Sequence, residues 1–440
     1  MAKEFEEELN HRRQERALRK QQEQAKLRKL RLKLILAAVV LIGAFAAIGI
    51  LTGGNRTPDD AVLENPTVET EAPTTEETTQ ETTSARNPTT TIHIKAAGDL
   101  NITDSVILAG AGAGGYNFTG CFQDVAGVRA EANLTMLNIE GNFCGEPYGS
   151  ATTSAPIQLA EALKAAGVDI VQMANSCSVN NGIIGLGTTL RNLRAAGLEP
   201  IGAYATEEEF ERAKGYTICE IEDIKVAIVA FTKGVGSRGL PTGSENCVNL
   251  LYTDFATTYS EVDTKRIKQI LQNAASEKPD ITIAMLHWGS EYNDTISSTQ
   301  KEIISLMQNQ GVDVIIGTHP HMVHSISYDE TTGNLVAYSL GDFFGDATRS
   351  GTAYSIILDV EITKDHDLGT TRVTGYSITP IYTLTEAEAA DSQRRVVRIR
   401  EAMLAYEFQF MNRVSASAYS NMEYSLVRIE DRIKVKEEKK

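Results

Sequence analysis

The chain has 440 residues, of which 42% are hydrophobic and 23% charged, an ordinary globular composition at a length that exceeds one average domain. Its net charge of −16 is uneven, because residues 1–33 carry eleven Lys or Arg and six Asp or Glu, a net of +5, which leaves −16 − 5 = −21 for the remainder. So acidic a remainder excludes nucleic acid as the expected partner, since phosphate recognition needs a basic surface on the folded domain.

Residues 1–33 combine helix-forming residues with mixed charge and a net positive excess. We interpret this segment as a basic cytoplasmic helix that lies next to the membrane and touches lipid head groups. A helix that binds a partner protein has the same composition and stays an alternative.

Residues 34–51 read LILAAVVLIGAFAAIGIL and contain no charged side chain. An apolar helix of about 20 residues crosses a bilayer, whereas a helix in a soluble protein needs no apolar surface all round. A cleaved signal peptide is disfavoured, because the preceding basic stretch is long and the following LTGGNR is not a small-residue cleavage site. Because the Lys and Arg residues precede the helix, we expect a single-pass signal-anchor in the cell membrane, with the N-terminus in the cytoplasm and the C-terminal domain extracellular.

Residues 52–91 are rich in Thr, Glu and Pro and poor in aromatic residues. Such a segment buries too little apolar surface to offset its ordering entropy, so we predict a disordered stalk. We expect the stalk to hold the folded domain away from the membrane.

From residue 92 onward, short apolar runs alternate with helical patterns. The strand-like runs cover 92–99, 133–140, 168–175, 226–232, 281–288, 312–319, 335–342 and 352–362, and the helix-like segments cover 155–167, 189–197, 264–278 and 299–311. Several of the helical segments end at Gly, a common helix stop. This alternation predicts a layered α/β domain over residues 92–385. Residues 386–440 are helical in pattern and end in a charged tail.

Five cysteines occur in the chain, and none forms a C-x-x-C pair, which argues against a structural zinc site. Outside the cytoplasm disulfides are permitted. We therefore expect at least one bond among Cys121, Cys144, Cys219 and Cys247, with Cys177 free. The pairing stays open at this point.

Polar side chains follow several of the predicted strands. They are Asp99, Glu140, Asn175, His287, His319 and His321. Because ligands gather at the carboxyl ends of strands in α/β folds, we expect these positions to converge on one cleft. Taken singly, each also fits a structural role, such as a turn residue, a solvated strand end or a satisfied core histidine. Together, carboxylates mixed with imidazoles indicate a divalent metal such as Mn, Fe or Zn, and two such ions near one another support phosphoester hydrolysis.

The tripeptide His319-Pro320-His321 directly follows a predicted strand. Pro320 has a fixed φ angle, and alternate residues of an extended chain point to the same side. We therefore predict that both imidazoles face one metal ion.

Five segments of the chain match an ordered set of family motifs. They are GDLNITD (98–104), NIEGNF (138–143), HWGSEY (287–292), GTHPHMVHS (317–325) and YSLGDFFGD (338–346). Through them, residues 92 to 384 resemble the bacterial capsule-synthesis CapA family. The resemblance implies a calcineurin-like metallophosphoesterase fold, with two mixed β-sheets flanked by helices. It also implies a role in making, exporting or anchoring an anionic capsule polymer, typically poly-γ-glutamate.

One motif departs from the family pattern. The family normally has A-N-N-H-x-x-D-x-G after its third strand, whereas residues 174–182 read ANSCSVNNG. Ser176 replaces the second Asn, Cys177 the His and Asn180 the Asp. In the wider phosphoesterase fold, the Asn–His pair supplies a metal ligand and an acid for the leaving group. Cys177 is either a thiolate ligand or a small buried residue.

The resemblance assigns roles to the polar positions. The metal ligands that it implies are Asp99, Glu140, His287, His319 and His321. The positions in catalytic roles are Asn175, Cys177 and His287.

Two functions are compatible with this pattern. The first is a membrane-anchored component of capsule-polymer assembly, whose cleft binds polymer ends or membrane proteins of polymer synthesis. The altered 174–182 motif favours it. The alternative is an active metal-dependent hydrolase of the phosphoesterase type, acting on a cell-surface polymer or a lipid-linked substrate. The charge of −21 opposes binding of a polyanion unless a metal or a local basic patch offsets it.

Overall fold

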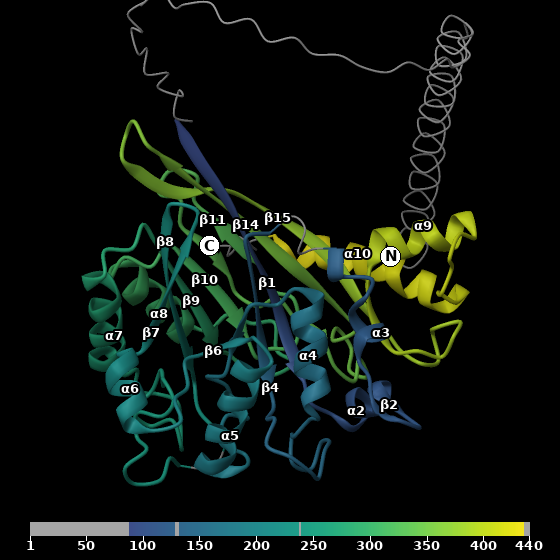
Figure 1. Ribbon diagram of the computed structural model, residues 1–440. Helices are drawn as coiled ribbons and strands as arrows, with labels where there is room; N and C mark the ends of the chain where they lie inside the picture. The colour runs from purple at the N-terminus through teal and green to yellow at the C-terminus, as the bar shows by residue number, and fades with distance from the viewer. Residues whose placement is uncertain (1–87, 128–131, 237–238, 435–440) are drawn as a thin grey trace, which may run out of the picture. The chain divides into compact units, whose positions relative to one another are not determined.

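The computed structural model of the chain describes residues 88–127, 132–236 and 239–434 (Figure 1). The predicted cytoplasmic helix, the predicted membrane helix and residues 52–87 of the predicted stalk lie outside the described residues. Among the residues that are described, no helix combines the length and apolar character needed to span a bilayer. Thr89–Thr91 already belong to a strand, so the folded domain begins slightly earlier than predicted.

The first sheet is mixed. Its strands are β1 (Thr89–Asn101), β4 (Leu134–Glu140), β5 (Ile170–Gln172), β6 (Glu199–Ile201), β13 (Asp342–Phe344), β14 (Tyr354–Asp365), β15 (Thr370–Leu384) and β16 (Arg395–Arg398). They lie in the order β16-β15-β14-β1-β4-β5-β6, and β13 pairs with the end of β1. The strands β1, β4, β5, β6 and β13 are parallel, whereas β14, β15 and β16 are joined by antiparallel pairing.

The second sheet is also mixed. Its strands are β7 (Tyr216–Ile221), β8 (Ile224–Thr232), β9 (Ile281–His287), β10 (Val314–Thr318), β11 (Ile326–Tyr328) and β12 (Leu335–Ala337). They lie in the order β11-β12-β10-β9-β8-β7, with a parallel centre and one antiparallel strand at each edge. A small hairpin, β2 (Ala111–Gly112) with β3 (Gly115–Tyr116), stands apart from both sheets.

The apolar run of β9 is uninterrupted because both faces of the strand are buried. Ile283 and Met285 pack into the core that also contains residues of β1 and β4. Ala284 and Leu286 pack instead with α7 (Thr264–Ser276) and α8 (Ser298–Gln308). The two sheets therefore face each other, with helices on the outside of the second.

Helices also cover the first sheet, where α4 (Ile157–Ala166) and α5 (Gly182–Ala195) contribute to the shared core (Figure 1). Two facing mixed sheets flanked by helices confirm the expected architecture at this level. The helix predicted over 189–197 is longer than expected, because it begins at Gly182. Three shorter helices complete this part of the chain: α2 (Asp104–Gly110), α3 (Thr119–Phe122) and α6 (Glu207–Ala213).

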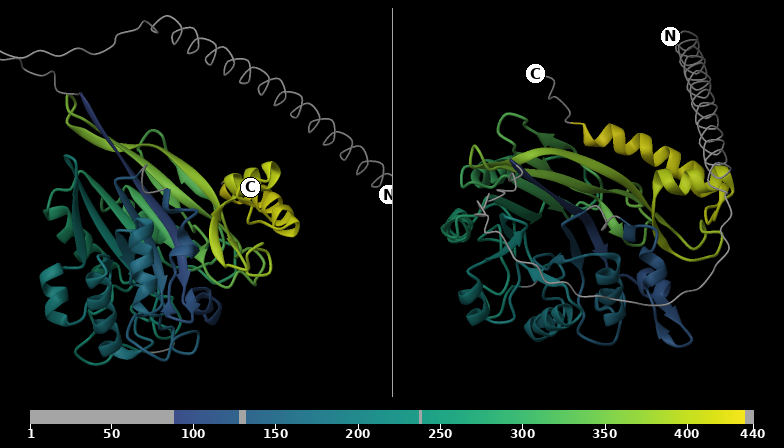
Figure 2. Two further views of the ribbon diagram at one scale, coloured as in Figure 1. Left: turned by 45° about the vertical axis from the view of Figure 1, so that its right-hand side comes forward. Right: turned by 45° about the horizontal axis from the view of Figure 1, so that its top comes forward.

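The segment after residue 385 is only partly helical. Residues 395–398 form β16, which extends the first sheet beside β15, and α9 (Ile399–Phe408) and α10 (Ala416–Ile433) follow. Within β16, the side chain of Arg395 is buried and pairs with Asp391. Figure 2 shows α9 and α10 beside the long strands β14 and β15. The C-terminal segment is thus built into the domain rather than appended to it.

The expected disulfide is absent from the described residues. Cys121, Cys144, Cys177, Cys219 and Cys247 are all free. The fold separates their surroundings: Cys121 lies in α3, and Cys219 lies in β7 at the edge of the second sheet. The prediction of at least one bond is therefore wrong in this structure.

Candidate metal centre

The carboxyl ends of strands from both sheets meet at one edge of the domain. In the first sheet, Asp99 lies two residues before the end of β1, and Glu140 ends β4. In the second, His287 ends β9, and His319 and His321 follow β10.

Their ligand atoms form three overlapping groups, within each of which all atoms lie within 4.8 Å of one another. The groups are Glu140 with His287 and His319, Asp99 with Glu140 and His321, and Glu291 with His319 and His321. The predicted convergence of the five residues is confirmed, and Glu140 is shared by two of the groups.

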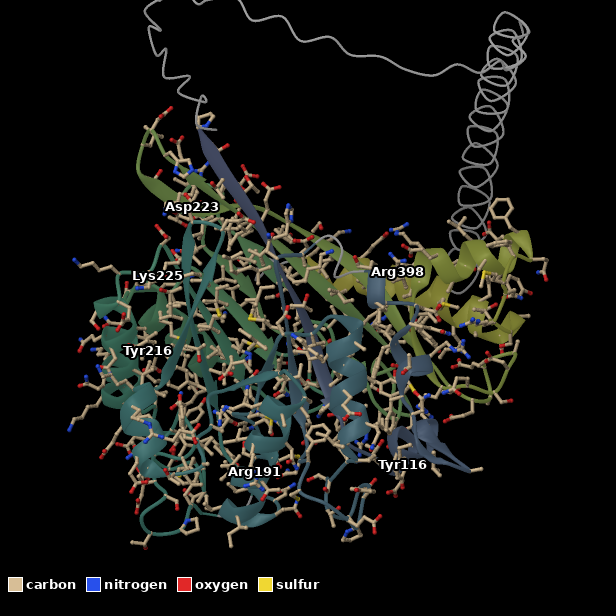
Figure 3. The ribbon with its side chains drawn as sticks, in the orientation of Figure 1. Tyr116, Arg191, Tyr216, Asp223, Lys225 and Arg398 are labelled. Atoms are coloured by element: carbon tan, nitrogen blue, oxygen red, sulfur yellow. The ribbon has the colours of Figure 1, made fainter. Side chains whose placement is uncertain are left out.

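The direction of β8 shows where the carboxyl ends of the strands, and so the centre, lie in the figures. Asp223 and Lys225 flank the start of β8 and are labelled in the upper part of Figure 3. Thr232 ends the same strand and contacts His287, so the centre lies at the opposite edge of the sheet.

Asp99 joins the two sheets at the centre. Its Oδ1 accepts a hydrogen bond from Asn138 Nδ2 at 2.7 Å, and its Oδ2 accepts one from the backbone N–H of His319 at 2.9 Å. Asn175 Nδ2 in turn donates to Asn138 Oδ1 at 3.1 Å. A chain of amides therefore fixes the carboxylate from β1 against the loop after β10.

The extended geometry predicted for the H-P-H tripeptide is wrong. His319 has φ of 92° and His321 has φ of 60°, both in the left-handed region that non-glycine residues rarely adopt. The two rings nevertheless lie 6.0 Å apart between centroids. A tight turn, not an extended strand, brings both imidazoles to the centre.

The hydrogen bonds of His287 determine which of its ring nitrogens carries the proton. Thr232 Oγ1 lies 2.8 Å from the carbonyl oxygen of Gly234 and 3.1 Å from His287 Nδ1. A carbonyl oxygen only accepts, so the one hydroxyl proton of Thr232 goes to Gly234, and His287 Nδ1 must donate to Thr232. Burial lowers the pKa of His287 well below its ordinary value, so the ring is neutral and Nε2 carries a lone pair.

That lone pair faces Oε1 of Glu140 at 2.9 Å. Burial raises the pKa of Glu140. Two acceptor atoms at this distance require either a proton on the carboxyl group or a cation that both atoms bind.

Burial also shifts the pKa values of the other members of the centre. Burial, and next the charge of Glu140, raises the pKa of Asp99 to about 8. His319 Nδ1 is buried without a hydrogen-bond partner, and burial lowers the pKa of this ring well below its usual range. Burial alone would lower the pKa of His321, but the carboxylates of Glu140 and Asp342 outweigh it and raise that pKa to about 11.

This donor set fits a divalent metal. It offers buried carboxylate oxygens whose ionisation needs a nearby positive charge, together with neutral imidazole nitrogens that have lone pairs available. Mixed oxygen and nitrogen ligands of this kind suit Mn, Fe or Zn. The ligand roles of Asp99, Glu140, His287, His319 and His321 stay predictions consistent with the geometry.

The altered motif has a different environment from the ligand set. Asn175 is fully buried, and its Nδ2 donates to the backbone oxygen of Ile139 at 2.6 Å while its Oδ1 accepts from the backbone N–H of Cys177 at 3.0 Å. Its amide therefore braces the loop. Burial raises the pKa of Cys177 to about 12, which disfavours a thiolate. Ser176 Oγ lies 3.4 Å from Glu140 Oε2 and so contacts the centre directly.

Sequence reasoning missed several residues that the fold adds. Asp342 Oδ1 lies 2.8 Å from His321 Nδ1, and Asn101 Nδ2 lies 3.5 Å from the same nitrogen. The tyrosine ring of Tyr292 stacks on His321 with centroids 5.2 Å apart.

Residues of the centre line two hollows. The first, of about 290 Å³, is lined by Glu140, Cys177, His321 and Arg349 among others. The second, of about 320 Å³, is lined by Ser176, Lys233, Tyr259 and His319 among others. Glu291 lines both, so the two hollows share a wall.

Residues 93–347 match the family model described as bacterial capsule synthesis protein PGA_cap. The chain is 26% identical to the capsule biosynthesis protein CapA of Bacillus anthracis over 211 residues, which is 48% of this chain and 48% of that protein. It is 26% identical to the PGA biosynthesis protein CapA of Bacillus subtilis (strain 168) over 243 residues, 54% of this chain and 58% of that protein. The chain thus spans about half the length of the curated relatives that it matches.

Solved structures show a more distant likeness. The calcineurin-like phosphoesterase YfkN from Bacillus subtilis aligns with a TM-score of 0.42 and 16% identity, over 67% of this chain and 91% of that chain. A phosphatase from Mycoplasma pneumoniae aligns with a TM-score of 0.40 and 15% identity, over 67% of this chain and 94% of that chain. TM-scores this low do not assign a fold, which is defined here by the topology of the two sheets.

Proposed function

Because the chain belongs to the bacterial capsule synthesis protein family PGA_cap, we propose that its folded domain binds a divalent cation and uses it to hold the anionic capsule polymer during synthesis, export or anchoring. The observation that carries the proposal is the contact between His287 Nε2 and Glu140 Oε1. It places two buried lone pairs face to face, beside the orphaned Nδ1 of His319. Asp99 and His321 complete the proposed ligand set.

A bound Mn, Fe or Zn ion would supply positive charge to an anionic ligand and polarise its oxygen atoms. The protein's own part is to hold the carboxylates in place. Asn138 and the backbone of His319 fix Asp99, and Thr232 orients His287. Loss of such an outer contact typically weakens metal binding about 10- to 100-fold.

Binding without turnover is the better-supported role, because the chain lacks the usual acid of the phosphoesterase motif. Cys177 occupies that position, and its raised pKa makes the thiol a poor partner for proton transfer near neutral pH. An active metal-dependent hydrolase stays the second candidate. It is favoured by the sharing of Glu140 between two ligand groups, an arrangement that suits two ions side by side.

The metal can be tested on the detergent-solubilised full-length protein. After loading with Mn²⁺, Fe²⁺ or Zn²⁺ and dialysis, the wild type should retain the metal in elemental analysis. Replacing both His319 and His321 by Ala should abolish retention, whereas replacing His93 and His366, which pair with Asp359 and Asp223 away from the centre, should not. Equal metal content in the wild type and the first double variant would refute the proposed centre.

We further propose that the apolar run at 34–51 anchors the chain in the cell membrane, with residues 1–33 in the cytoplasm and the domain outside. The support is the charge-free run and the basic residues before it. Protease added to intact cells should then digest the domain and leave a small protected N-terminal fragment. A fully protected chain, or a mature protein that starts near Thr52, would contradict this arrangement.

A further inference from the structure

Arg349 lies on a fixed loop at the mouth of the first hollow. The backbone N–H and the hydroxyl of Thr352 both donate to the carbonyl oxygen of Arg349, at 3.2 and 3.0 Å. At the other side of the loop, Arg394 Nη1 donates to the carbonyl oxygens of Gly345 and Asp346 at 2.8 and 3.1 Å. Hydrogen bonds within the folded domain therefore hold the backbone at Arg349 in place.

A row of planar groups leads from this loop to the centre. The guanidinium carbon of Arg349 lies 4.1 Å from the ring centroid of Tyr292. That ring stacks in turn on His321, with centroids 5.2 Å apart and planes at 24°. Tyr292 is held in place because its backbone N–H donates to the carbonyl oxygen of Pro320 at 3.0 Å. Arg349, Tyr292 and His321 all line the first hollow, and together they connect an exposed arginine to a buried proposed metal ligand.

The guanidinium of Arg349 has donors available for a ligand. The side chain is exposed, and in the part of the chain that the structure describes it makes no ion pair with a carboxylate. A guanidinium that stacks on a ring by its face keeps its edge N–H groups available as donors. A planar fork of this kind matches a carboxylate through two parallel hydrogen bonds.

Acidic side chains line the first hollow, so binding of a polyanion there depends on Arg349. Among the described residues that line the first hollow, Arg349 is the only Lys or Arg. His321 also lines it but is buried and paired with Asp342, and the carboxyl groups of Glu140, Glu291 and Asp346 line the same hollow. A polyanion is repelled by this lining unless a cation receives it.

The cation of the second hollow is engaged by protein groups already. Lys233 Nζ donates to the carbonyl oxygen of Gly289 at 2.7 Å and lies 4.6 Å from the ring centroid of Tyr259. Its ammonium is thereby drawn toward the wall of that hollow.

We propose that Arg349, stacked on Tyr292, forms a subsite that binds one carboxylate of the anionic polymer while a neighbouring group of the same polymer reaches the metal centre. The inference rests on the proposed function and adds a specificity-determining residue to it. It makes the first hollow the side from which the polymer enters the site.

The test measures binding of short poly-γ-glutamate to metal-loaded full-length protein by calorimetry. Arg349→Met should weaken binding about tenfold and reduce its salt dependence, because a charge-assisted hydrogen-bonded pair is lost. Arg349→Lys should fall between the variant and the wild type, since it keeps the charge and loses the fork. Arg372→Met is the matched control: Arg372 is also exposed, but it pairs with Thr363 at the opposite end of the first sheet.

The metal content of each preparation is measured in parallel, so the two proposals fail separately. If the wild type retains metal but Arg349→Met and Arg372→Met bind the polymer equally well, the subsite is refuted and the metal centre stands. If the wild type retains no metal yet Arg349→Met alone weakens polymer binding, the subsite stands and the metal centre falls. A wild type that does not bind the polymer refutes the subsite. Inorganic phosphate as a second probe separates carboxylate from phosphate recognition, and an Arg349-dependent preference for phosphate would overturn the carboxylate assignment.

Discussion

Replacing Glu140 by Gln should separate metal binding from stability. Gln keeps the size of the side chain and one carbonyl oxygen, and it exchanges the other oxygen for an amino group. Because His287 Nε2 is an acceptor, that amino group can donate to it across the present 2.9 Å contact. In the variant, a hydrogen bond therefore joins the side chain at position 140 to His287 Nε2. In the wild type, the two facing lone pairs need a cation or a proton between them.

Two opposite effects follow. Glu140 belongs to two of the three ligand groups, so its loss should weaken metal binding by more than the removal of an outer partner does, at least about 100-fold or about 2.7 kcal/mol. In the metal-free protein the exchange removes a buried carboxyl group with a raised pKa and adds a neutral hydrogen bond of about 1 kcal/mol. The metal-free variant should therefore melt about 2–4 °C above the metal-free wild type.

Thermal melts of chelator-treated full-length protein, followed by metal titration, measure both effects on one preparation. Asp313→Asn is the matched control, because Asp313 is another acid whose pKa is raised by burial, and it precedes β10 at the end opposite His319. The control should leave metal affinity unchanged. A Glu140→Gln protein that binds metal like the wild type, or one that loses stability in the metal-free state, would refute the account of the centre.

Two further outcomes are expected. Restoring the family motif with Ser176→Asn and Cys177→His should raise hydrolysis of a simple aryl phosphate by the metal-loaded protein at least about 100-fold, the usual contribution of a positioned acid. Cys177→Ser alone should give no gain. If the double variant gives no gain either, the centre is not a silenced phosphoesterase. The metal-free protein should lose stability as pH rises from 6.5 to 8. The pKa of Asp99 is raised from 3.8 to about 8, and the pKa of His321 is raised from 6.5 to about 11. Both groups therefore hold protons in the folded state that the unfolded chain releases. The slope should approach about 1.4 kcal/mol per pH unit for each group and flatten when Mn²⁺ is added; a flat melting temperature without metal would contradict the raised pKa values.

The sequence was sufficient for the parts of the site that depend on strand patterns. A run such as ITIAMLH is apolar throughout only if both faces are buried, and a polar residue at its end must then leave the sheet at a carboxyl edge. This reasoning brought Asp99, Glu140 and His287 together although they are far apart in the chain. It does not depend on the exact strand boundaries, which differ from the prediction at several strands.

The sequence was not sufficient where the backbone leaves regular structure. The left-handed turn at His319 and His321 has no local sequence signal, since neither residue is Gly or Asn. Tyr292 and Arg349 meet His321 only through loops that the packing of both sheets places. The sequence around β16 has a helical pattern, so the strand was not predicted. A buried arginine is not expected in a strand unless it has a partner, and the pairing of Arg395 with Asp391 is seen only in the structure.

The acidic charge of the domain and the acidic polymer that we propose as its ligand are reconciled only if metal and polymer bind together. Glu140, Asp99 and Asp342 lie at the base of the site, where burial raises the pKa of each, so their ionisation needs a nearby cation, and the same cation can receive a polyanion. If the metal strengthens polymer binding by some factor, linkage requires that the polymer strengthen metal binding by the same factor. We expect a coupling of about 5–150-fold, measured as the ratio of poly-γ-glutamate affinities with and without Mn²⁺ and, independently, as the ratio of Mn²⁺ affinities with and without the polymer. Arg349→Met should weaken polymer binding in both metal states and leave this ratio unchanged, whereas Glu140→Gln should bring it to one. A ratio of one in the wild type would mean that the polymer does not contact the metal centre.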